Sequence, residues 1–320
     1  METGLNQRPG ITVVIPSRNG LDLLRSCLPP LLGALGRDDE VIVVDDASDD
    51  GTSDHLSRQF PAVGVIRMRV SRGFGDACNA GVARASRPLV LLINNDMVVR
   101  DGFLAPLIEH FRDADVFAVG AQYRMRRGLH GAYACSICGA LHREEDETVH
   151  GVTLSIDAPA GGGLFDRDKF LRLGGFDPLF RPFYWEDTDL GYRAWQRGWR
   201  ILRDPRSVMY HEEGATIRAL HTRQWAEQIH VRNRLLFVWK NVRDWDLLVQ
   251  HCGLMGLRAA QDLFSRPGMI FVRAAVAALG RLPQAMRARF RGDLAPHRFS
   301  DRELAHQVLE WPHLLLSQIR

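Results

Sequence analysis

The sequence predicts an α/β protein with a mainly parallel central sheet flanked by helices. Two segments contain a run of β-branched and aliphatic residues that ends abruptly in carboxylates and amides, and a third places acidic residues beside aromatic ones: Glu40–Thr52, Pro88–Asp96 and Phe183–Leu190. Runs of this kind fit strands covered on both faces. Because open α/β sheets bind ligands at the carboxyl ends of their strands, Asp45, Asp46 and Asp96 are expected to lie at one site.

The N-terminal part reads as alternating strands and helices. A strand over 11–15 stops at Pro16, leucines with helical spacing follow over 21–35, and a second strand begins at Val41. The pattern then predicts a helix near 53–59, a strand at 63–68, a helix at 74–85 and a strand from Pro88 to Asn94. This order is typical of a parallel sheet with right-handed crossovers.

The pattern weakens between residues 116 and 154, where we expect irregular strands and loops. A glycine-rich turn and a short helix are expected over 160–177, with backbone that approaches a ligand closely. A helix over 187–197 and a strand over 199–202 then lead toward His211.

Helices are predicted beyond Thr222, with breaks at Pro267, Pro283 and Pro296. We place a domain boundary near residue 218. The prediction is therefore a catalytic domain over 1–217 and a helical C-terminal extension over 218–320.

Composition and charge set broad limits on function. With 320 residues, of which 46% are hydrophobic and 25% charged, the chain can bury a large core. The net charge of +3 is unevenly distributed, because residues 1–217 hold 25 basic and 30 acidic side chains whereas 218–320 hold 16 and 8. A basic extension suits an anionic membrane surface or is an ordinary solvated helical face. Aromatic and basic residues do not alternate as in RNA-binding motifs, so nucleic acid is not an expected partner.

Five cysteines at unrelated spacings argue for a reducing compartment. The N-terminus lacks the apolar core of a signal peptide, and no apolar run reaches the roughly 20 residues needed to span a bilayer. We therefore expect a cytoplasmic protein, with peripheral attachment to the inner membrane face left open. The pair Cys135 and Cys138 is too little for a zinc site without a second pair.

An ordered series of motifs resembles one enzyme family. The series comprises VVIPSRNG, VVDDASDDGT, SRGFGDACNAG, LLINND, AGGGLFDRDKF, GGFDPLF, WEDTDLGYR and YHEEG. Together these motifs, from about Ile11 to Gly214, resemble the family 2 inverting glycosyltransferases of the GT-A fold. Asn-Asn-Asp and Trp-Glu-Asp are similar to rhamnosyltransferase-like and galactofuranosyltransferase-like members, which build cell-surface polysaccharides or glycolipids from nucleotide sugars.

The resemblance implies a site for the donor nucleotide. Asp46 corresponds to the carboxylate that accepts hydrogen bonds from the base, while capping is the alternative role for Asp45 and Asp46. Pro16 and Arg18 resemble the nucleotide-contacting turn. Arg72 lies where a cation could reach the base or diphosphate, although either arginine could be an ordinary solvated side chain.

The expected cofactor is a divalent metal, Mg²⁺ or Mn²⁺. Asp96 is the preferred ligand, because these ions favour carboxylate oxygens that they share with substrate phosphates. The resemblance adds His211 as a second ligand. Asn94 and Asn95 replace the carboxylate of the familiar Asp-x-Asp, so Asn95 is assigned to the ribose and a metal-independent variant stays open.

The resemblance also implies an acceptor side, where Asp187 is the predicted general base, held ionised at the start of a helix. Trp185 offers a face for an acceptor sugar. Glu186 is expected to orient the acceptor, and Gly162 to let backbone approach a sugar. Capping by Asp187 is a compatible alternative.

Two other functions remain as alternatives. A nucleotidyltransferase would need a glycine-rich, Lys/Arg-containing loop for triphosphate near the N-terminus, which VVIPSRNG does not supply. A non-catalytic scaffold that binds nucleotide sugars would be expected to lack the base or a metal ligand, but Asp96, Asp187 and His211 are all present.

Overall fold

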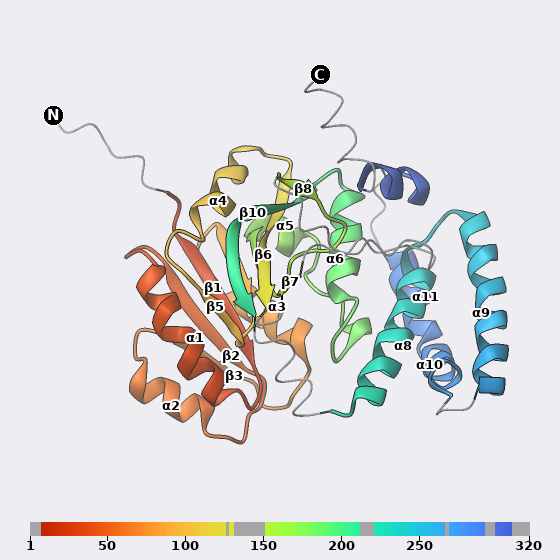
Figure 1. Ribbon diagram of the computed structural model, residues 1–320, viewed down its shortest axis with the longest axis horizontal. Helices are drawn as coiled ribbons and strands as arrows, with labels where there is room; N and C mark the ends of the chain where they lie inside the picture. Colours follow the sequence, from red (N-terminus) through yellow and green to blue (C-terminus); the bar gives the residue numbers. More distant parts are fainter. Residues whose placement is uncertain are drawn as a thin grey trace.

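The computed structural model describes residues 8–125, 128–130, 151–211, 221–265, 269–291 and 298–308. Its centre is a sheet with the strand order β3-β2-β1-β4-β9-β6-β10-β5, and β7 and β8 pair at its sides (Figure 1). The first four strands along this path are β3 (Gly64–Arg67), β2 (Glu40–Asp45), β1 (Ile11–Ser17) and β4 (Leu89–Ile93). The others are β9 (Gly162–Asp166), β6 (Val116–Met125), β10 (Arg200–His211), β5 (Met97–Val99), β7 (Gly128–His130) and β8 (Thr153–Leu154).

Six strands of this path run in one direction. β1 pairs in parallel with β2 and β4, β2 with β3, and β6 with β10, while β9 lies antiparallel between β4 and β6. In this register Ser17 lies opposite Asp45. The mainly parallel α/β prediction is confirmed, and the acidic ends of β2 and β4 meet at one edge of the sheet.

The sheet is buried because its strands are almost wholly apolar. Every residue of β1 and of β4 is buried, as expected for strands covered on both faces. Helix α3 (Phe74–Arg84) packs on β1 and β2, and helix α1 (Leu21–Ala34) packs beside β5. The remaining helices of this part are α2 (Thr52–Gln59), α4 (Ala105–Glu109), α5 (Arg167–Arg172) and α6 (Glu186–Trp195), with the short 3₁₀ turns η1 (His110–Arg112) and η2 (Pro178–Phe180).

Three predictions for the second half of the sheet were wrong in detail. Residues 116–125, predicted to be irregular, form the long strand β6 in the middle of the sheet. Of the glycines predicted to form a turn, Gly161 does so, but Gly162 and Gly163 lie in β9, which pairs with β4 and β6 on either side. The last strand begins at Arg200 and continues to His211, well beyond residue 202. Helical and strand patterns are hard to read where glycine and arginine interrupt a buried strand.

The C-terminal part is helical, as predicted. It contains α8 (Arg223–Asn241), α9 (Trp245–Ser265), α10 (Ile270–Leu279) and α11 (Leu282–Arg291), which lie together beyond α6, and residues 301–308 form a further helix (Figure 1). The break expected near Pro283 is present, because α10 ends at Leu279 and α11 begins at Leu282, so that Pro283 stands in the first turn of α11, where proline is tolerated. Pro267, Pro296 and the boundary near 218 lie outside the described residues, as do Cys135 and Cys138.

Within the described ranges, none of the helices has the length and apolar character that a membrane crossing requires. Helix α8 contacts the loop before α6 through Asn233 and α6 itself through Lys240.

Candidate active site

Asp96 and His211, which are far apart in the sequence, lie together at one edge of the sheet. Asp96 stands in the turn between β4 and β5, and His211 ends β10 directly opposite Met97 of β5. The distance from His211 Nε2 to Asp96 Oδ1 is 3.2 Å. This oxygen is buried and accepts no hydrogen bond from the described part of the chain. A carboxylate oxygen and an imidazole nitrogen thus converge as a donor pair suited to a divalent ion.

Gly162 lies next to this pair and is shaped by close packing. A Cβ atom at this position would lie 2.9 Å from both Tyr123 and Met209 and 3.0 Å from Met97. The Tyr123 ring lies 6.2 Å from the His211 ring. Because Gly162 has no side chain, β9 can pack directly against Tyr123, Met209 and Met97 near His211. The predicted acceptor contact of Gly162 stays a prediction.

A second cluster of metal-ligating residue types is Glu109, His110 and Asp204, whose ligand atoms lie within 4.8 Å of one another. Asp204 Oδ2 lies 2.8 Å from His110 Nε2. The Arg206 guanidinium binds both Asp204, at 3.0 Å from Nε to Oδ1, and Glu109. Since an arginine already neutralises these carboxylates, a metal would have to displace a cation, and the cluster reads as an ion-pair network.

Asp46 is buried and anchors the loop before α3. Its carboxylate accepts hydrogen bonds from the Ser71 hydroxyl at 2.7 Å and from the Arg72 and Gly73 amides at 2.8 and 2.9 Å. Arg18 Nη1 also reaches Ser71, at 2.7 Å. The structure thus brings the predicted nucleotide residues Arg18, Asp46 and Arg72 together, and both arginine side chains are exposed.

Neighbouring residues of the same edge are structural in character. Asp45 accepts a hydrogen bond from the Ser48 amide at 2.8 Å and another from the Ser53 hydroxyl, so it holds the turn into α2, the alternative role considered for it. Asn95 Nδ2 donates to Ser17 Oγ at 2.9 Å. Pro16 is buried within β1. The nucleotide contacts of Pro16 and Asn95 stay predictions.

The loop before α6 is held in an unusual conformation. Tyr184 and Trp185 both have positive φ, at 73° and 74°, a region that costs aromatic residues energy and that clusters at functional sites. Asn233 of α8 clamps the loop, because its Nδ2 lies 2.6 Å from Phe180 O, 3.0 Å from Phe183 O and 2.9 Å from Tyr184 O.

The same loop also contacts the nucleotide side. The Phe74 amide donates to Pro182 O at 3.0 Å, and a Cβ at Gly73, where φ is 93°, would lie 2.3 Å from that oxygen. Only glycine allows this approach. The loop that Asp46 anchors and the loop that leads to Asp187 are therefore one packed unit.

Asp187 lies at the second position of α6 and is half-buried. Its Oδ1 accepts a hydrogen bond from the Thr188 amide at 2.8 Å. Burial nevertheless raises the pKa of Asp187, which outweighs the lowering effect of this hydrogen bond. The Thr188 amide at the helix start favours the ionised form of Asp187, as expected, and burial opposes it. Asp187 is also not the N-cap, which is Trp185.

Glu186 and Trp185 are more enclosed than the sequence suggested. Glu186 Oε2 is buried and accepts no hydrogen bond from a described residue, and burial, with the nearby charge of Asp187, raises its pKa well above the usual range. The Trp185 ring is 7% exposed and packs 5.3 Å from the Phe237 ring of α8. Trp185 thus packs against α8, and the acceptor contacts of both residues stay predictions.

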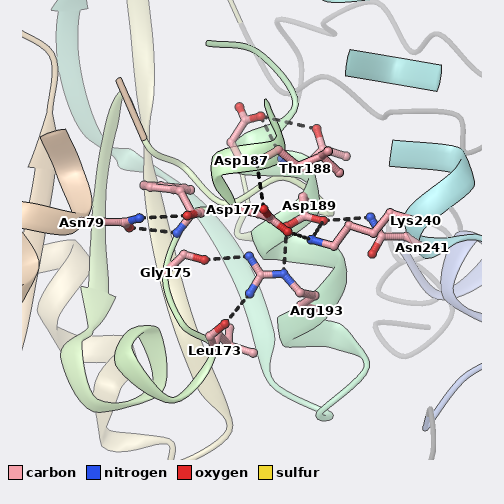
Figure 2. A network of polar contacts seen from close by, with 12 residues as sticks. Asn79, Leu173, Gly175, Asp177, Asp187, Thr188, Asp189, Arg193, Lys240 and Asn241 are labelled. Carbon is pink, nitrogen blue, oxygen red and sulfur yellow. Dashed lines mark hydrogen bonds and ion pairs between the residues drawn. The ribbon is translucent and has the colours of Figure 1, made fainter. Parts of the chain in front are cut away.

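The pKa of Asp189, two positions beyond Asp187, is shifted in the opposite direction. Asp189 is fully buried, and its carboxylate lies 2.8 Å from Arg193 Nε, 2.6 Å from Lys240 Nζ and 2.9 Å from Asn241 Nδ2 (Figure 2). Burial alone would raise its pKa, but these two cations lower it. Arg193 continues the network to Leu173 O and Gly175 O at 2.6 and 2.7 Å. Asp189 therefore ties α6 to α8 and to the loop before η2.

Comparison with known proteins identifies the family. The profile described as "Glycosyltransferase like family 2" matches residues 9–235, which is more than half of the chain. The chain belongs to this family. The match extends through β10 into α8, so it includes Asp46, Asp96, Asp187, His211 and Asn233.

Curated relatives of this family 2 chain are longer proteins. A "Pre-mycofactocin glycosyltransferase" of Mycobacterium tuberculosis (strain CDC 1551 / Oshkosh) is 29% identical over 222 residues, which cover 65% of this chain and 44% of the relative. A "Poly-beta-1,6-N-acetyl-D-glucosamine synthase" of Staphylococcus aureus (strain MSSA476) is 22% identical over 242 residues, covering 72% of this chain and 57% of the relative. The chain spans about half the length of these proteins.

Solved structures support the GT-A fold. GalNAc-T7 with UDP, GalNAc and Mn²⁺ superposes with a TM-score of 0.57 at 17% identity, covering 73% of this chain and 49% of that one. The mannosyltransferase PcManGT from Pyrobaculum calidifontis, in complex with GDP-Man and Mn²⁺, gives a TM-score of 0.54 at 18% identity, covering 98% and 81%. At these identities the similarity establishes the fold.

Several residues of the family 2 site carry no sequence signal of their own. Ser71 begins the SRGFGDACNAG motif, but no sequence pattern shows that it hydrogen-bonds to Asp46, and Asn233 stands outside the motifs altogether. Asp157 lies between the stretch predicted to be irregular, over 116–154, and the glycine-rich segment from residue 160, and neither prediction covers it, yet its Oδ1 is buried beside α6. Lys240 would have been found by asking which cation could neutralise the buried Asp189, since a buried carboxylate requires one.

Proposed function

We propose that this chain transfers a sugar from a nucleoside diphosphate sugar to a hydroxyl group of a saccharide or lipid-linked acceptor, with inversion at the anomeric carbon. The observation that carries the proposal is the electrostatic environment of Asp187. Burial raises its pKa, and within the described ranges no Lys, Arg or His forms an ion pair with it. A carboxylate of raised pKa at neutral pH is a stronger base than an ordinary one.

The reaction is a single displacement. Asp187 takes the proton of the acceptor hydroxyl while the hydroxyl oxygen bonds to the anomeric carbon of the donor. The bond between that carbon and the diphosphate oxygen breaks, and the nucleoside diphosphate leaves with the electron pair. One displacement on the face opposite the leaving group inverts the anomeric configuration. A second carboxylic acid to protonate the leaving group, as in inverting glycosidases, is not needed.

Asp96 and His211 would hold a divalent ion, Mg²⁺ or Mn²⁺. The residues fit this group, because Asp96 Oδ1 is a buried acceptor without a hydrogen-bond donor from the described chain and His211 Nε2 lies 3.2 Å away. When bound, such an ion offsets charge on a departing diphosphate. Asn94 and Asn95 reduce the negative charge of the protein here, so the nucleotide itself would supply part of the ligand set.

The donor base would lie against the Asp46 loop. Asp46 already fixes the amides of Arg72 and Gly73, so its contribution would be to shape this loop as well as to face the base. The exposed guanidinium groups of Arg18 and Arg72 suit the base or the diphosphate.

More specifically, we favour a rhamnose-type donor and a role in the synthesis of cell-surface polysaccharides. The support is the pair of motifs Asn94-Asn95-Asp96 and Trp185-Glu186-Asp187, which are similar to rhamnosyltransferase-like and galactofuranosyltransferase-like members. The name of the S. aureus relative, a polysaccharide synthase, agrees with the polysaccharide role.

The test is calorimetric titration of the protein with UDP, dTDP and GDP, each with and without Mn²⁺. One nucleotide is expected to bind in a metal-dependent manner. Asp96→Ala should weaken that binding by roughly tenfold or more, because even the loss of a residue that merely supports a metal ligand costs this much. The nucleotide that binds would also identify the class of donor sugar nucleotide.

Glu109→Gln is the matched control, since it removes a carboxylate from the cluster that Arg206 already neutralises. It should leave nucleotide binding unchanged. Equal weakening by both variants would contradict the metal assignment. Binding of a nucleotide without any sugar transfer would favour the scaffold function, and release of pyrophosphate from a nucleoside triphosphate would indicate a nucleotidyltransferase.

The C-terminal helices are proposed to contact an anionic membrane surface. The outward side of α9 exposes apolar residues, with Trp245 75%, Leu257 65% and Phe264 88% exposed, and Phe290 of α11 is 78% exposed. Exposed arginines of the same region, Arg258, Arg273 and Arg287, supply positive charge. Apolar insertion with basic attraction is the combination that interfacial helices use.

Sedimentation with vesicles tests this contact. The protein should sediment with vesicles that contain anionic lipid at low salt and less with neutral vesicles, and Phe264→Ser should weaken the binding. No binding to anionic vesicles at low salt would refute the membrane proposal and leave the transfer reaction untouched.

A further inference from the structure

The segment that carries Asp157 is fixed against α6. The Ala158 amide donates to Asp187 O at 3.2 Å, and Trp195 Nε1 donates to Ser155 O at 2.9 Å. A Cβ at Gly191 would lie 1.9 Å from Ile156 O, so the backbone is in direct contact with the helix. The position of Asp157 relative to Asp187 is therefore set by the fold.

Thr188 interacts with both Asp157 and Asp187. Its Oγ1 lies 3.5 Å from Asp187 Oδ1, and its side chain lowers the pKa of Asp157. Asp157 Oδ1 is buried and accepts no hydrogen bond from any described residue. Two like charges at such a place, with one oxygen unsolvated, repel each other strongly.

Other charged and titratable groups face the pair from three elements. Glu186 is next to Asp187 on α6, and its own pKa is raised by burial and by the Asp187 charge. Arg203 of β10 and Tyr123 of β6 stand on the other side, with the Arg203 guanidinium 5.7 Å from the Tyr123 ring centre. Burial and the Asp187 charge raise the pKa of Asp157 to about 7, against the lowering influence of Thr188 and Arg203.

We propose that Asp157 and Asp187 act as a carboxylate pair that shares one proton around Thr188, with Asp157 as the positioning residue that sets the basicity of Asp187. This proposal rests on the proposed function, in which Asp187 is the base. Before transfer the pair holds one proton. It takes a second proton from the acceptor hydroxyl, and one proton is released to solvent before the next turnover.

The hydrogen bonds indicate which member holds the first proton. Asp187 Oδ1 accepts the Thr188 amide at 2.8 Å, and a bond of this kind favours the ionised form. Asp157 Oδ1 has no such donor in the described chain. The proton therefore belongs on Asp157 and the negative charge on Asp187, which is the arrangement that a base requires.

The first experiment measures thermal unfolding of the unmodified protein, Asp157→Asn and Asp168→Asn between pH 5.5 and 8.5. A carboxyl whose pKa is raised on folding stabilises the protein when protonated, and this stability is lost as the pH rises through about 7. The midpoint of Asp157→Asn relative to the unmodified protein should therefore rise by about 3 °C or more across this range. Asp168, whose side chain is 74% exposed, is the control and should show no such trend.

The second experiment measures release of nucleoside diphosphate against pH, with Mn²⁺ and the UDP-, dTDP- or GDP-sugar whose nucleotide binds in the calorimetric titration. The unmodified protein should gain activity as the pH rises through the neutral range. Asp157→Asn should abolish this rise, because the rise follows loss of the Asp157 proton near pH 7, and the charge that this leaves on Asp157 makes Asp187 a stronger base. The plateau of this variant should fall, since without that charge Asp187 is a weaker base.

A difference in unfolding midpoint that does not depend on pH, together with an activity profile of Asp157→Asn that keeps the rise near pH 7, would overturn the carboxylate pair. If Asp157→Asn does not fold, a ¹³C titration of the aspartate carboxyl groups in the unmodified protein decides the question, because the pair should titrate near neutral pH. If no nucleotide sugar reacts, the proposed function fails, whereas the unfolding and titration measurements still test the pair.

Discussion

Asp187 and Asp189 stand two residues apart on α6, yet their surroundings differ in kind. Asp189 is surrounded by Arg193, Lys240 and Asn241, and the two cations lower its pKa. Asp187 has the Thr188 amide, and burial raises its pKa. Successive positions along a helix point about 100° apart, so one residue faces α8 and its cations while the other faces Asp157.

The difference separates a carboxylate that holds the protein together from one that we propose acts as the base. A buried carboxylate with matched cations is stable but has little tendency to take a proton. A buried carboxylate without a cation costs stability and gains basicity. The acidic motif Glu-Asp-Thr-Asp thus contains both kinds, and its residue types alone do not distinguish them.

Replacement of the proposed base has the largest expected effect. Asp187→Asn should lower sugar transfer by roughly 10²- to 10⁴-fold, because it removes the proton acceptor and little volume. Nucleotide binding should be unchanged. Since the pKa of Asp187 is raised on folding, its ionised form opposes folding at alkaline pH, and the variant should be at least as stable as the unmodified protein at pH 8.

Initial rates, calorimetry and thermal unfolding of the same preparation check these three results. Near-normal transfer by Asp187→Asn would reject Asp187 as the base. Loss of transfer accompanied by loss of nucleotide binding would place Asp187 in the donor site instead.

Replacement of the structural carboxylate should act on stability first. Asp189→Asn leaves Lys240 and Arg193 without their common partner and should cost roughly 3 to 5 kcal/mol at pH 7. The pKa of Asp189 is lowered on folding, so its stabilisation is present at neutral pH and is lost as the pH falls through the folded-state pKa. The difference between variant and unmodified protein should therefore shrink in acid.

Urea unfolding at pH 7 and at pH 2.5, which lies below the ordinary pKa of an aspartate, measures this difference. Asp22→Asn is the matched control, because Asp22 forms an ion pair with Arg25 on a helix surface and its side chain is 91% exposed. It should change stability little at either pH. A small effect of Asp189→Asn at pH 7 would remove the contrast between the two carboxylates of α6.

The part of the molecule that sequence reasoning described well is the part with regular patterns. The parallel strands β1, β2 and β4 and the intervening helices follow apolar runs and turn signals closely. Asp96 and His211 were placed in one site by the family resemblance, and they are neighbours in the structure.

The features that the sequence did not predict depend on contacts between segments that are distant in the sequence. β6 and β9 carry glycines and arginines within buried strands, so their apolar pattern is interrupted. The raised pKa of Asp187 depends on burial within the folded site, which cannot be read from its neighbours in sequence. The clamp by Asn233 depends on the packing of α8 against a loop about fifty residues earlier.

The clamp and the Asp189 network also decide where this chain could be cut and joined to a relative. Asn233, Lys240 and Asn241 all belong to α8, and each contacts the loops or the helix that present Asp187. The family profile ends at residue 235, before Lys240 and Asn241. A hybrid enzyme with a foreign C-terminal part should therefore be spliced after Asn241, since an earlier junction would separate the reacting helix from the side chains that orient it.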